Sequence, residues 1–383
     1  MARVVVLGGG FGGLAAAVEL RSLLPDGHEV VLVDRRDGFF MGFAKLWDLA
    51  GTRPLAQGTR PLANLARRGV RVLRAEVLAL DPGRRTVSTS EGDLTADGMV
   101  VALGASFDPE QVASLRPPAF NLYDPKALGP AREALRALDG GRVVVTVLGV
   151  PYKCPPAPYE AAFLLDQWLR DEGRRPRVEL SVSTPQPMVL PVAGPEASAR
   201  VAVALEERGV AVGTGRAVSG LDPGSGTVRF ADGSVERFDL LLGVPRHVAS
   251  PVLAAAGFLG PSGWVEPDPR TLRTAFERVY AVGDCTAVPA GQGQLPKAGV
   301  FAEAQGRVAA RNLVAELTGG PGAEFDGRGA CFLEVGGGQA AVIEGEFFAP
   351  GGPAVRLSEP DEATLRAKAA FERERLEAWL PER

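Results

Sequence analysis

Short apolar segments separated by glycine-rich or polar turns recur along most of the chain. Residues 3–7 and 29–33 have strand length and are apolar after their first residue, and the apolar spacing over residues 14–24 predicts a helix between them. The same order returns with a strand over 142–149, a helix over 160–170 and a strand over 177–183. A repeated strand–helix–strand unit predicts an α/β protein with two sheets of parallel strands.

The remaining pattern predicts how these units are divided into domains. Further buried strands are expected over 99–104, 239–244 and 279–284, a helix over 298–317, a β-ribbon over 331–348 and a terminal helix over 361–379. We expect the buried strand at 279–284 to join the first sheet. The chain would therefore re-enter the first domain near Asp268. We therefore place a first domain over residues 1–105 and 268–320, a second over 106–267 and a small C-terminal α+β domain over 321–383.

The turn after the first strand has the spacing of a dinucleotide-binding fingerprint. Gly8-Gly-Gly-Phe-Gly-Gly13 links the strand to the helix, and Asp34 ends the second strand about 20 residues later. Glycines let a pyrophosphate approach the helix N-terminus, and the acidic side chain can hold a ribose hydroxyl. An ordinary glycine-rich turn is the alternative. We expect a Rossmann-like fold whose cofactor contacts include Gly8, Gly10, Phe11, Gly13, Asp34 and Arg35.

The second unit has the fold signature without the phosphate cradle. Gly149 is followed by Val-Pro-Tyr, and then by Lys153, Cys154 and a run of prolines. Without further glycines, a pyrophosphate could not approach this backbone. We therefore expect a second Rossmann-like domain with a degenerate nucleotide site. The helix N-terminus and Lys153 are expected to favour the thiolate of Cys154.

Composition narrows the class of protein. With 383 residues, 46% of them hydrophobic and 23% charged, the chain suits a multidomain enzyme without a membrane-spanning segment. A net charge of −4 gives no basic field for nucleic acid. Because a strand follows Met1 directly, no signal peptide is expected and the protein is placed in the cytoplasm. Three cysteines provide neither a disulfide framework nor a metal site, and only five lysines accompany 37 arginines.

The order of these motifs resembles one family. It is similar to the sulfide:quinone oxidoreductases and to the flavoprotein subunits of flavocytochrome c sulfide dehydrogenase, both disulfide-reductase-like flavoproteins. The similarity covers nearly the whole chain and rests on the fingerprint, Val-Ala-Leu-Gly104, Cys154-Pro-Pro-Ala-Pro-Tyr-Glu160, Val-Gly-Asp284-Cys285, Leu-Pro-Lys297-Ala-Gly and Ala-Cys331-Phe-Leu-Glu. The resemblance implies FAD in the first fold. It is expected to be noncovalent, because no cysteine precedes Cys154.

The resemblance also implies roles for individual residues. Cys154 and Cys331 would form a redox disulfide that hydrosulfide opens, with two electrons then passing to the flavin. Lys297 would stabilise the reduced flavin from a helix N-terminus, and Glu160 would accept a proton. Gly104, Gly283 and Asp284 would contact FAD, and Cys285 is expected to be a small buried residue nearby. Each role has an alternative. The cysteines could be buried structural residues, and Lys297 could lie on the surface. Glu160 could only interact with the helix dipole, and Asp284 could be a helix N-cap.

Three functions remain open at this point. The first is an FAD-dependent oxidoreductase that takes electrons from sulfide or a related sulfur species and gives them to quinone or a cytochrome. An NADH:quinone oxidoreductase-like flavoenzyme is the second, and a non-catalytic flavin redox partner or sensor is the third. Because the terminal helix is charged, we expect it to pack against the body of the protein or against a second copy in a homodimer. Any contact with a membrane is expected to be peripheral at most.

Overall fold

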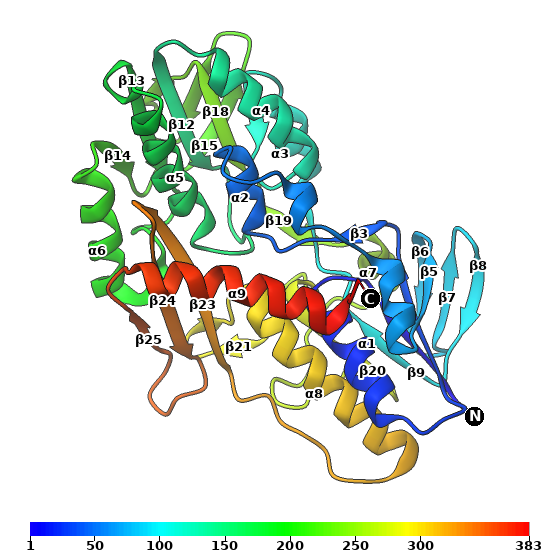
Figure 1. The fold of residues 1–383 in the computed structure, drawn as a ribbon. Helices are drawn as coiled ribbons and strands as arrows, with labels where there is room; N and C mark the ends of the chain where they lie inside the picture. Colours follow the sequence, from blue (N-terminus) through cyan, green and yellow to red (C-terminus); the bar gives the residue numbers. More distant parts are fainter. Residues whose placement is uncertain (383) are drawn as a thin grey trace.

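Two five-stranded parallel sheets form the framework of the computed structural model, which describes residues 1–382. The first sheet has the order β20-β9-β1-β2-β5, from strands Val279–Ala281, Gly98–Val101, Arg3–Leu7, Glu29–Asp34 and Arg71–Arg74. The crossover after β1 is helix α1 (Phe11–Leu23), and α8 (Gly299–Thr318) packs against α1 (Figure 1). Fully buried valines in β1 and β2 explain why these strands read as continuous apolar runs.

The second sheet repeats this arrangement farther along the chain. Its order is β11-β18-β12-β13-β14, from strands Ala119–Asn121, Leu240–Val244, Gly141–Val147, Val178–Ser183 and Val210–Gly213. Helix α5 (Ala157–Asp171) is its crossover after β12, and α4 (Pro125–Ala137) and α6 (Gly194–Glu206) belong to the same unit (Figure 1).

The C-terminal segment adds an antiparallel sheet and a long helix. Strands β23 (Arg328–Gly336), β24 (Gln339–Glu346) and β25 (Ala354–Leu357) form the sheet, and α9 (Glu362–Trp379) follows. In Figure 1, α9 (red) passes between α5 and α8. Its Trp379 ring packs edge-on against Phe11 of α1 at 5.7 Å, while its Lys368 bonds to Glu160 of α5 at 2.7 Å. The helix therefore connects both parallel-sheet units.

Smaller elements complete the described chain. Two three-stranded antiparallel sheets contain β6 (Val77–Asp81), β7 (Thr86–Thr89) and β8 (Gly92–Thr95), and β15 (Val218–Asp222), β16 (Thr227–Phe230) and β17 (Val235–Arg237). Two-stranded pairs are β3 (Gly38–Phe39) with β4 (Arg60–Pro61), β10 (Ala105–Phe107) with β19 (His247–Ala249), and β21 (Pro289–Ala290) with β22 (Gly293–Gln294). The short helices are α2 (Ala44–Leu49), α3 (Pro109–Ser114) and α7 (Pro251–Ala255).

The predicted fold class is confirmed. Both strand–helix–strand units, the ribbon and the terminal helix form where the sequence places them, with boundaries shifted by a few residues. The exact domain limits at residues 105, 268 and 321 stay predictions. Within residues 1–382, no helix is both long enough and apolar enough to cross a bilayer.

Candidate active site

The fingerprint turn holds β1 and α1 in close contact. Gly8 has a φ of +101°, and a Cβ at Gly13 would stand 1.8 Å from the Gly8 carbonyl oxygen. Gly10 differs, since no heavy atom lies within 4 Å of where its Cβ would be. Gly13 is thus needed for strand–helix packing, whereas Gly10 leaves the N-terminus of α1 accessible to a ligand.

Asp34 lies at the end of β2, beside this turn. Its carboxylate accepts the Gly9 amide at 2.6 Å and two bonds from the Arg36 guanidinium, at 3.0 and 2.8 Å. Burial works to raise the pKa of Asp34, but the bonds from Arg36 and Gly9 outweigh it and lower the pKa. Arg35 pairs with Glu76 on the surface at 3.0 Å, and its contact with a cofactor stays a prediction.

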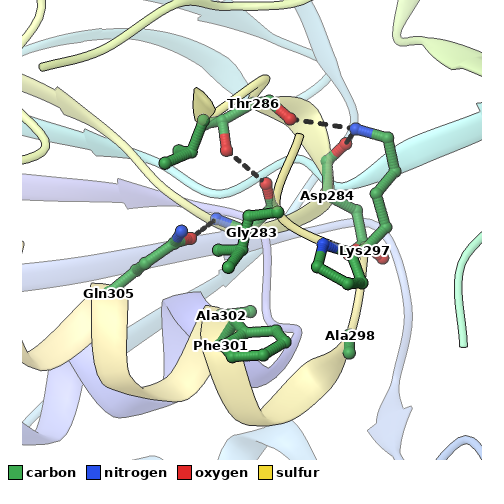
Figure 2. A pocket seen from close by; sticks show the side chains of 11 residues that line it. Gly283, Asp284, Thr286, Lys297, Ala298, Phe301, Ala302 and Gln305 are labelled. Carbon is green, nitrogen blue, oxygen red and sulfur yellow. Dashed lines mark hydrogen bonds between the residues drawn. The ribbon is translucent and has the colours of Figure 1, made fainter. Parts of the chain in front are cut away.

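A second part of the site lies where the loop after β20 meets the start of α8. Figure 2 shows Gly283, Asp284 and Lys297 lining one small pocket. The Lys297 ammonium donates to the carbonyls of Asp284 and Thr286, both at 2.9 Å, and lies 3.4 Å from the centre of the Trp264 ring. Burial lowers the pKa of Lys297 to about 8, although Asp284 opposes this shift. The ammonium is therefore neither a surface group nor paired by a direct carboxylate contact.

The nearby Cys285 is fully buried, as predicted, and its thiol contacts the Val282 carbonyl at 3.2 Å. Gly104, with a φ of +67°, follows β9 of the same sheet, whose neighbouring strand β20 leads to Gly283. Phe11 packs against Phe39 and Trp379, so its ring contributes to the core.

Cys154 is held directly beside this pocket. Its amide donates to the Lys297 carbonyl at 2.7 Å, and its backbone has a φ of +52°, which is uncommon for a residue with a side chain. The Tyr123 hydroxyl donates to the carbonyls of Lys153 and Cys154 at 2.8 and 3.2 Å. The bond to Lys297 joins the cysteine loop of the second unit to the first, and the bonds from Tyr123 hold the loop within its own unit.

Cys331 reaches the same region from strand β23. Both cysteines are free thiols and partly accessible. Burial and then Glu160 raise the pKa of Cys154 to about 11, and burial followed by the charge of Cys154 raises the pKa of Cys331 to about 12. The two side chains are thus close enough to interact electrostatically. The expectation of a stabilised Cys154 thiolate is wrong for this state, because burial and Glu160 outweigh the positive charges of Lys45 and Lys368.

The N-terminus of α5 has few donors left for a ligand. Proline at positions 155, 156 and 158 supplies no amide hydrogen, and the amides of residues 157, 159 and 160 already donate to the carbonyls of Cys154 and Pro156. The adjacent turn is also filled. A Cβ at Gly149 would stand 3.0 Å from both Arg246 and Gln111. This helix end therefore lacks what a pyrophosphate requires.

Comparison with known proteins agrees with this architecture. The family model described as "Pyridine nucleotide-disulphide oxidoreductase" matches residues 2–126 and 167–306. The chain belongs to this family. A second model, described as the central part of the flavoprotein chain of sulfide dehydrogenase [flavocytochrome c], matches residues 131–187.

Individual members of the family are similar over most of their length. The mitochondrial sulfide:quinone oxidoreductase of Mus musculus is 24% identical over 362 residues, covering 90% of this chain and 78% of that protein. The demethylphylloquinone reductase NdbB of Synechocystis sp. is 28% identical over 337 residues, covering 83% and 80%. The crystal structure of the sulfide:quinone oxidoreductase from Aquifex aeolicus superposes with a TM-score of 0.86 at 23% identity, covering 100% and 96%.

Near Cys154, the structure adds Lys45, Lys368 and His247 to the residues predicted from the sequence. Four of the five lysines surround Cys154: Lys153 precedes it, Lys297 accepts its amide bond, and Lys45 and Lys368 lower its pKa. His247, which was not among the predicted site residues, is 1% exposed and packs between the Phe107 and Tyr123 rings. The scarcity of lysine was the one available signal, since arginine replaces it almost everywhere else.

Glu160 is buried in an ion cluster rather than facing solvent at a helix end. Its two oxygens accept the Lys368 ammonium at 2.7 Å and the Glu334 amide at 3.0 Å. Burial raises the pKa of Glu160 even though Lys368 opposes the shift. Glu334 and Lys368 are therefore direct neighbours of Glu160, and the predicted role of Glu160 as a proton acceptor stays a prediction.

Proposed function

We propose that this protein is an FAD-dependent oxidoreductase that oxidises sulfide, or a related small sulfur species, through a redox disulfide between Cys154 and Cys331. The observation that carries the proposal is that Cys154 acts electrostatically on Cys331, while the Cys154 amide is bonded to Lys297 of the Lys297–Asp284 pocket. The two cysteines come from separate units of the fold, and neither motif would bring them together alone. The names of the relatives in Mus musculus and Aquifex aeolicus support the same donor.

The residues of the first unit fit noncovalent FAD. Gly8 and Gly13 shape the turn, Gly10 leaves the N-terminus of α1 accessible, and Asp34 is placed for a ribose hydroxyl. Gly104, Gly283, Asp284 and Lys297 would hold the remainder of the cofactor, and a bound flavin would supply an acceptor for two electrons. An ammonium at Lys297 favours negative charge on a reduced cofactor.

The chemistry assigned to the protein's own residues is thiol–disulfide exchange. Hydrosulfide attacks one sulfur of the Cys154–Cys331 disulfide, which forms a persulfide there and releases the other cysteine as a thiolate. The lysines around Cys154 favour both the incoming anion and the released thiolate. Glu160 is the proton acceptor for this step.

An NADH-dependent reaction would need a second nucleotide site, and the second unit does not offer one. The amides at the start of α5 are absent or occupied, and Arg246 and Gln111 fill the turn at Gly149. Because backbone donors at this position bind the pyrophosphate in a working Rossmann unit, NADH should not bind productively. We retain quinone or a cytochrome as the electron acceptor, reached with at most peripheral membrane contact.

Anaerobic mixing of the purified flavoprotein with sulfide or NADH tests the proposal. We expect sulfide to bleach the flavin absorbance rapidly and NADH to leave it unchanged. Bleaching by NADH alone would support the NADH:quinone alternative, and no bleaching by either donor would support a redox partner or sensor. Repeating the sulfide reaction with a soluble quinone and with cytochrome c then identifies which acceptor restores the absorbance.

A further inference from the structure

The two elements that carry the cysteines are joined by one buried ion cluster. Lys368 of α9 donates to Glu160 of α5 at 2.7 Å and to Glu334 of β23 at 2.8 Å. Glu160 lies six residues after Cys154, and Glu334 lies three residues after Cys331. The Glu334 amide also donates to Glu160 at 3.0 Å, so the two elements that carry the cysteines, α5 with its preceding loop and β23, are bonded to each other.

This cluster is buried and contains an excess of negative charge. Lys368 is fully buried, and Glu160 and Glu334 are 2% and 8% exposed. The other groups around the ammonium are the Phe43 and Trp47 rings, whose centres lie 5.0 and 5.1 Å from it, and the Trp47 indole donates to Glu334 at 2.7 Å. One ammonium therefore serves two carboxylates, and burial raises the pKa of Glu160 although Lys368 opposes the shift.

We propose that Lys368 is the positioning residue of the cysteine pair, holding α5 and β23 together through Glu160 and Glu334, and that this cluster receives the proton released when hydrosulfide opens the disulfide. The inference rests on the proposed function and adds two residues to it. Lys368 lies outside the motifs by which the family was recognised, and Glu334 ends the Cys331 motif but had no role assigned to it.

The proton and electron balance defines what the cluster does. The hydrosulfide sulfur forms a new S–S bond to one cysteine, the Cys154–Cys331 bond breaks, and the other cysteine leaves as a thiolate. Two electrons pass from the sulfide sulfur to the cysteine pair. The persulfide hydrogen then moves as a proton to Glu160, and Lys368 stays paired with Glu334.

The charged and titratable groups that face the thiols determine whether a substitution raises or lowers the pKa of each cysteine. Glu160 raises the pKa of both cysteines, and Lys368 lowers that of Cys154. The further groups are Lys45 and Asp284, which act on Cys154, and Lys153, Lys297, Tyr123 and Tyr152, which neighbour or interact with it. Opposite effects are therefore expected from removing the lysine and from removing the carboxylate.

The first test follows thiol reactivity against pH. Flavin-loaded protein with reduced cysteines is alkylated with iodoacetamide, and each cysteine is followed by mass spectrometry. We expect Lys368→Met to slow the alkylation of Cys154 at least fivefold at pH 8.5. We expect Glu160→Gln to accelerate the alkylation of both cysteines at least fivefold. Loosened packing would accelerate alkylation in both variants, so changes of the same sign would overturn the inference, as would unchanged pH profiles.

A matched control removes a cation from another buried carboxylate of the same helix. Arg175 donates to the fully buried Asp166 of α5 at 2.6 Å, with no bond to α9 or β23 among the described residues. Arg175→Met should leave both alkylation profiles within twofold of the wild type. A larger change there would mean that any lost buried ion pair disturbs the thiols.

The double variant Lys368→Met/Glu160→Gln removes one charge of each sign, so it should fold even if Lys368→Met does not. We expect alkylation within twofold of the wild type but sulfide-driven bleaching at least tenfold slower, because the proton acceptor is missing. Wild-type bleaching rates would instead overturn the inference. If sulfide fails to bleach even the wild type, the proposed function fails, while the alkylation profiles still test the positioning role of Lys368.

Discussion

The N-termini of α1 and α5 occupy equivalent positions in two similar folds, yet they suit different chemistry. At α1, glycines hold the turn close to β1 and leave Gly10 without neighbours within 4 Å. At α5, prolines replace the donors, the remaining amides are occupied, and a cysteine loop lies where a phosphate would otherwise bind. The same strand–helix crossover therefore supports a dinucleotide site in one unit and a thiol site in the other.

The difference shows that the crossover fixes only the place of a site, while the residues at the helix start decide what binds there. Backbone amides can bind a phosphate only when they lack other acceptors. In the second unit, the Cys154 and Pro156 carbonyls take those amides, and the Cys154 amide donates to Lys297 of the first unit. The second helix start is thereby attached to the first unit.

The largest effect is expected from Gly13→Val in the first unit. The new Cβ would stand 1.8 Å from the Gly8 carbonyl oxygen, so β1 and α1 would have to separate. We expect the variant to lose FAD and at least about 3 kcal/mol of unfolding free energy. Flavin absorbance of the purified protein and a urea titration measure both quantities.

Gly10→Ala is the control for this experiment, because its Cβ would meet no protein atom within 4 Å. Its unfolding free energy should stay within about 1 kcal/mol of the wild type, while FAD affinity falls. Full FAD affinity in Gly10→Ala would show that the cofactor does not approach this helix start.

The second largest effect concerns the thiols of the other unit. Cys154→Ser and Cys331→Ser should each slow sulfide-driven bleaching by at least about 100-fold, because each removes the disulfide that hydrosulfide attacks. Stopped-flow absorbance measures this rate. Cys285→Ala, which removes a buried thiol bonded only to backbone carbonyls, should leave the rate within about threefold. Equal losses in all three variants would point to general damage around the flavin.

Residues within single elements were largely predictable from the sequence, in contrast to residues brought together by the fold. The fingerprint glycines, Asp34, Cys154 and Cys285 lie where local spacing places them. Lys368 could not be recognised, because it belongs to a charged terminal helix and gains its role only through Glu160 and Glu334, which are 208 and 34 residues away. The bonds from Arg36 to Asp34 were not predicted either, because the sequence does not show which way neighbouring arginine side chains turn.

The rate of sulfide-driven bleaching should depend on pH through Lys297. This lysine belongs to the first unit, and its carbonyl binds the cysteine loop of the second. Burial lowers its pKa to about 8, so the ammonium is present below pH 8 and is lost as the pH rises through this value. Because the positive charge favours the reduced cofactor, sulfide-driven bleaching should slow above pH 8. In Lys297→Met, we expect a rate about tenfold lower at pH 7 and no transition near pH 8. A wild-type transition that persists in this variant would have another origin.

The smallest effect is expected from Arg246→Ala, which separates the two reasons for excluding a nucleotide from the second unit. Arg246 is half exposed and pairs with Asp108 at 2.5 Å, so its loss should cost about 1 kcal/mol or less of unfolding free energy. The substitution removes the arginine side chain beyond its Cβ, keeps that Cβ and Gln111 beside Gly149, and leaves the amides of α5 occupied. NADH should therefore still fail to bleach the flavin. If NADH bleaches it in this variant, the arginine side chain, rather than the helix start, is what keeps the second unit from binding a dinucleotide.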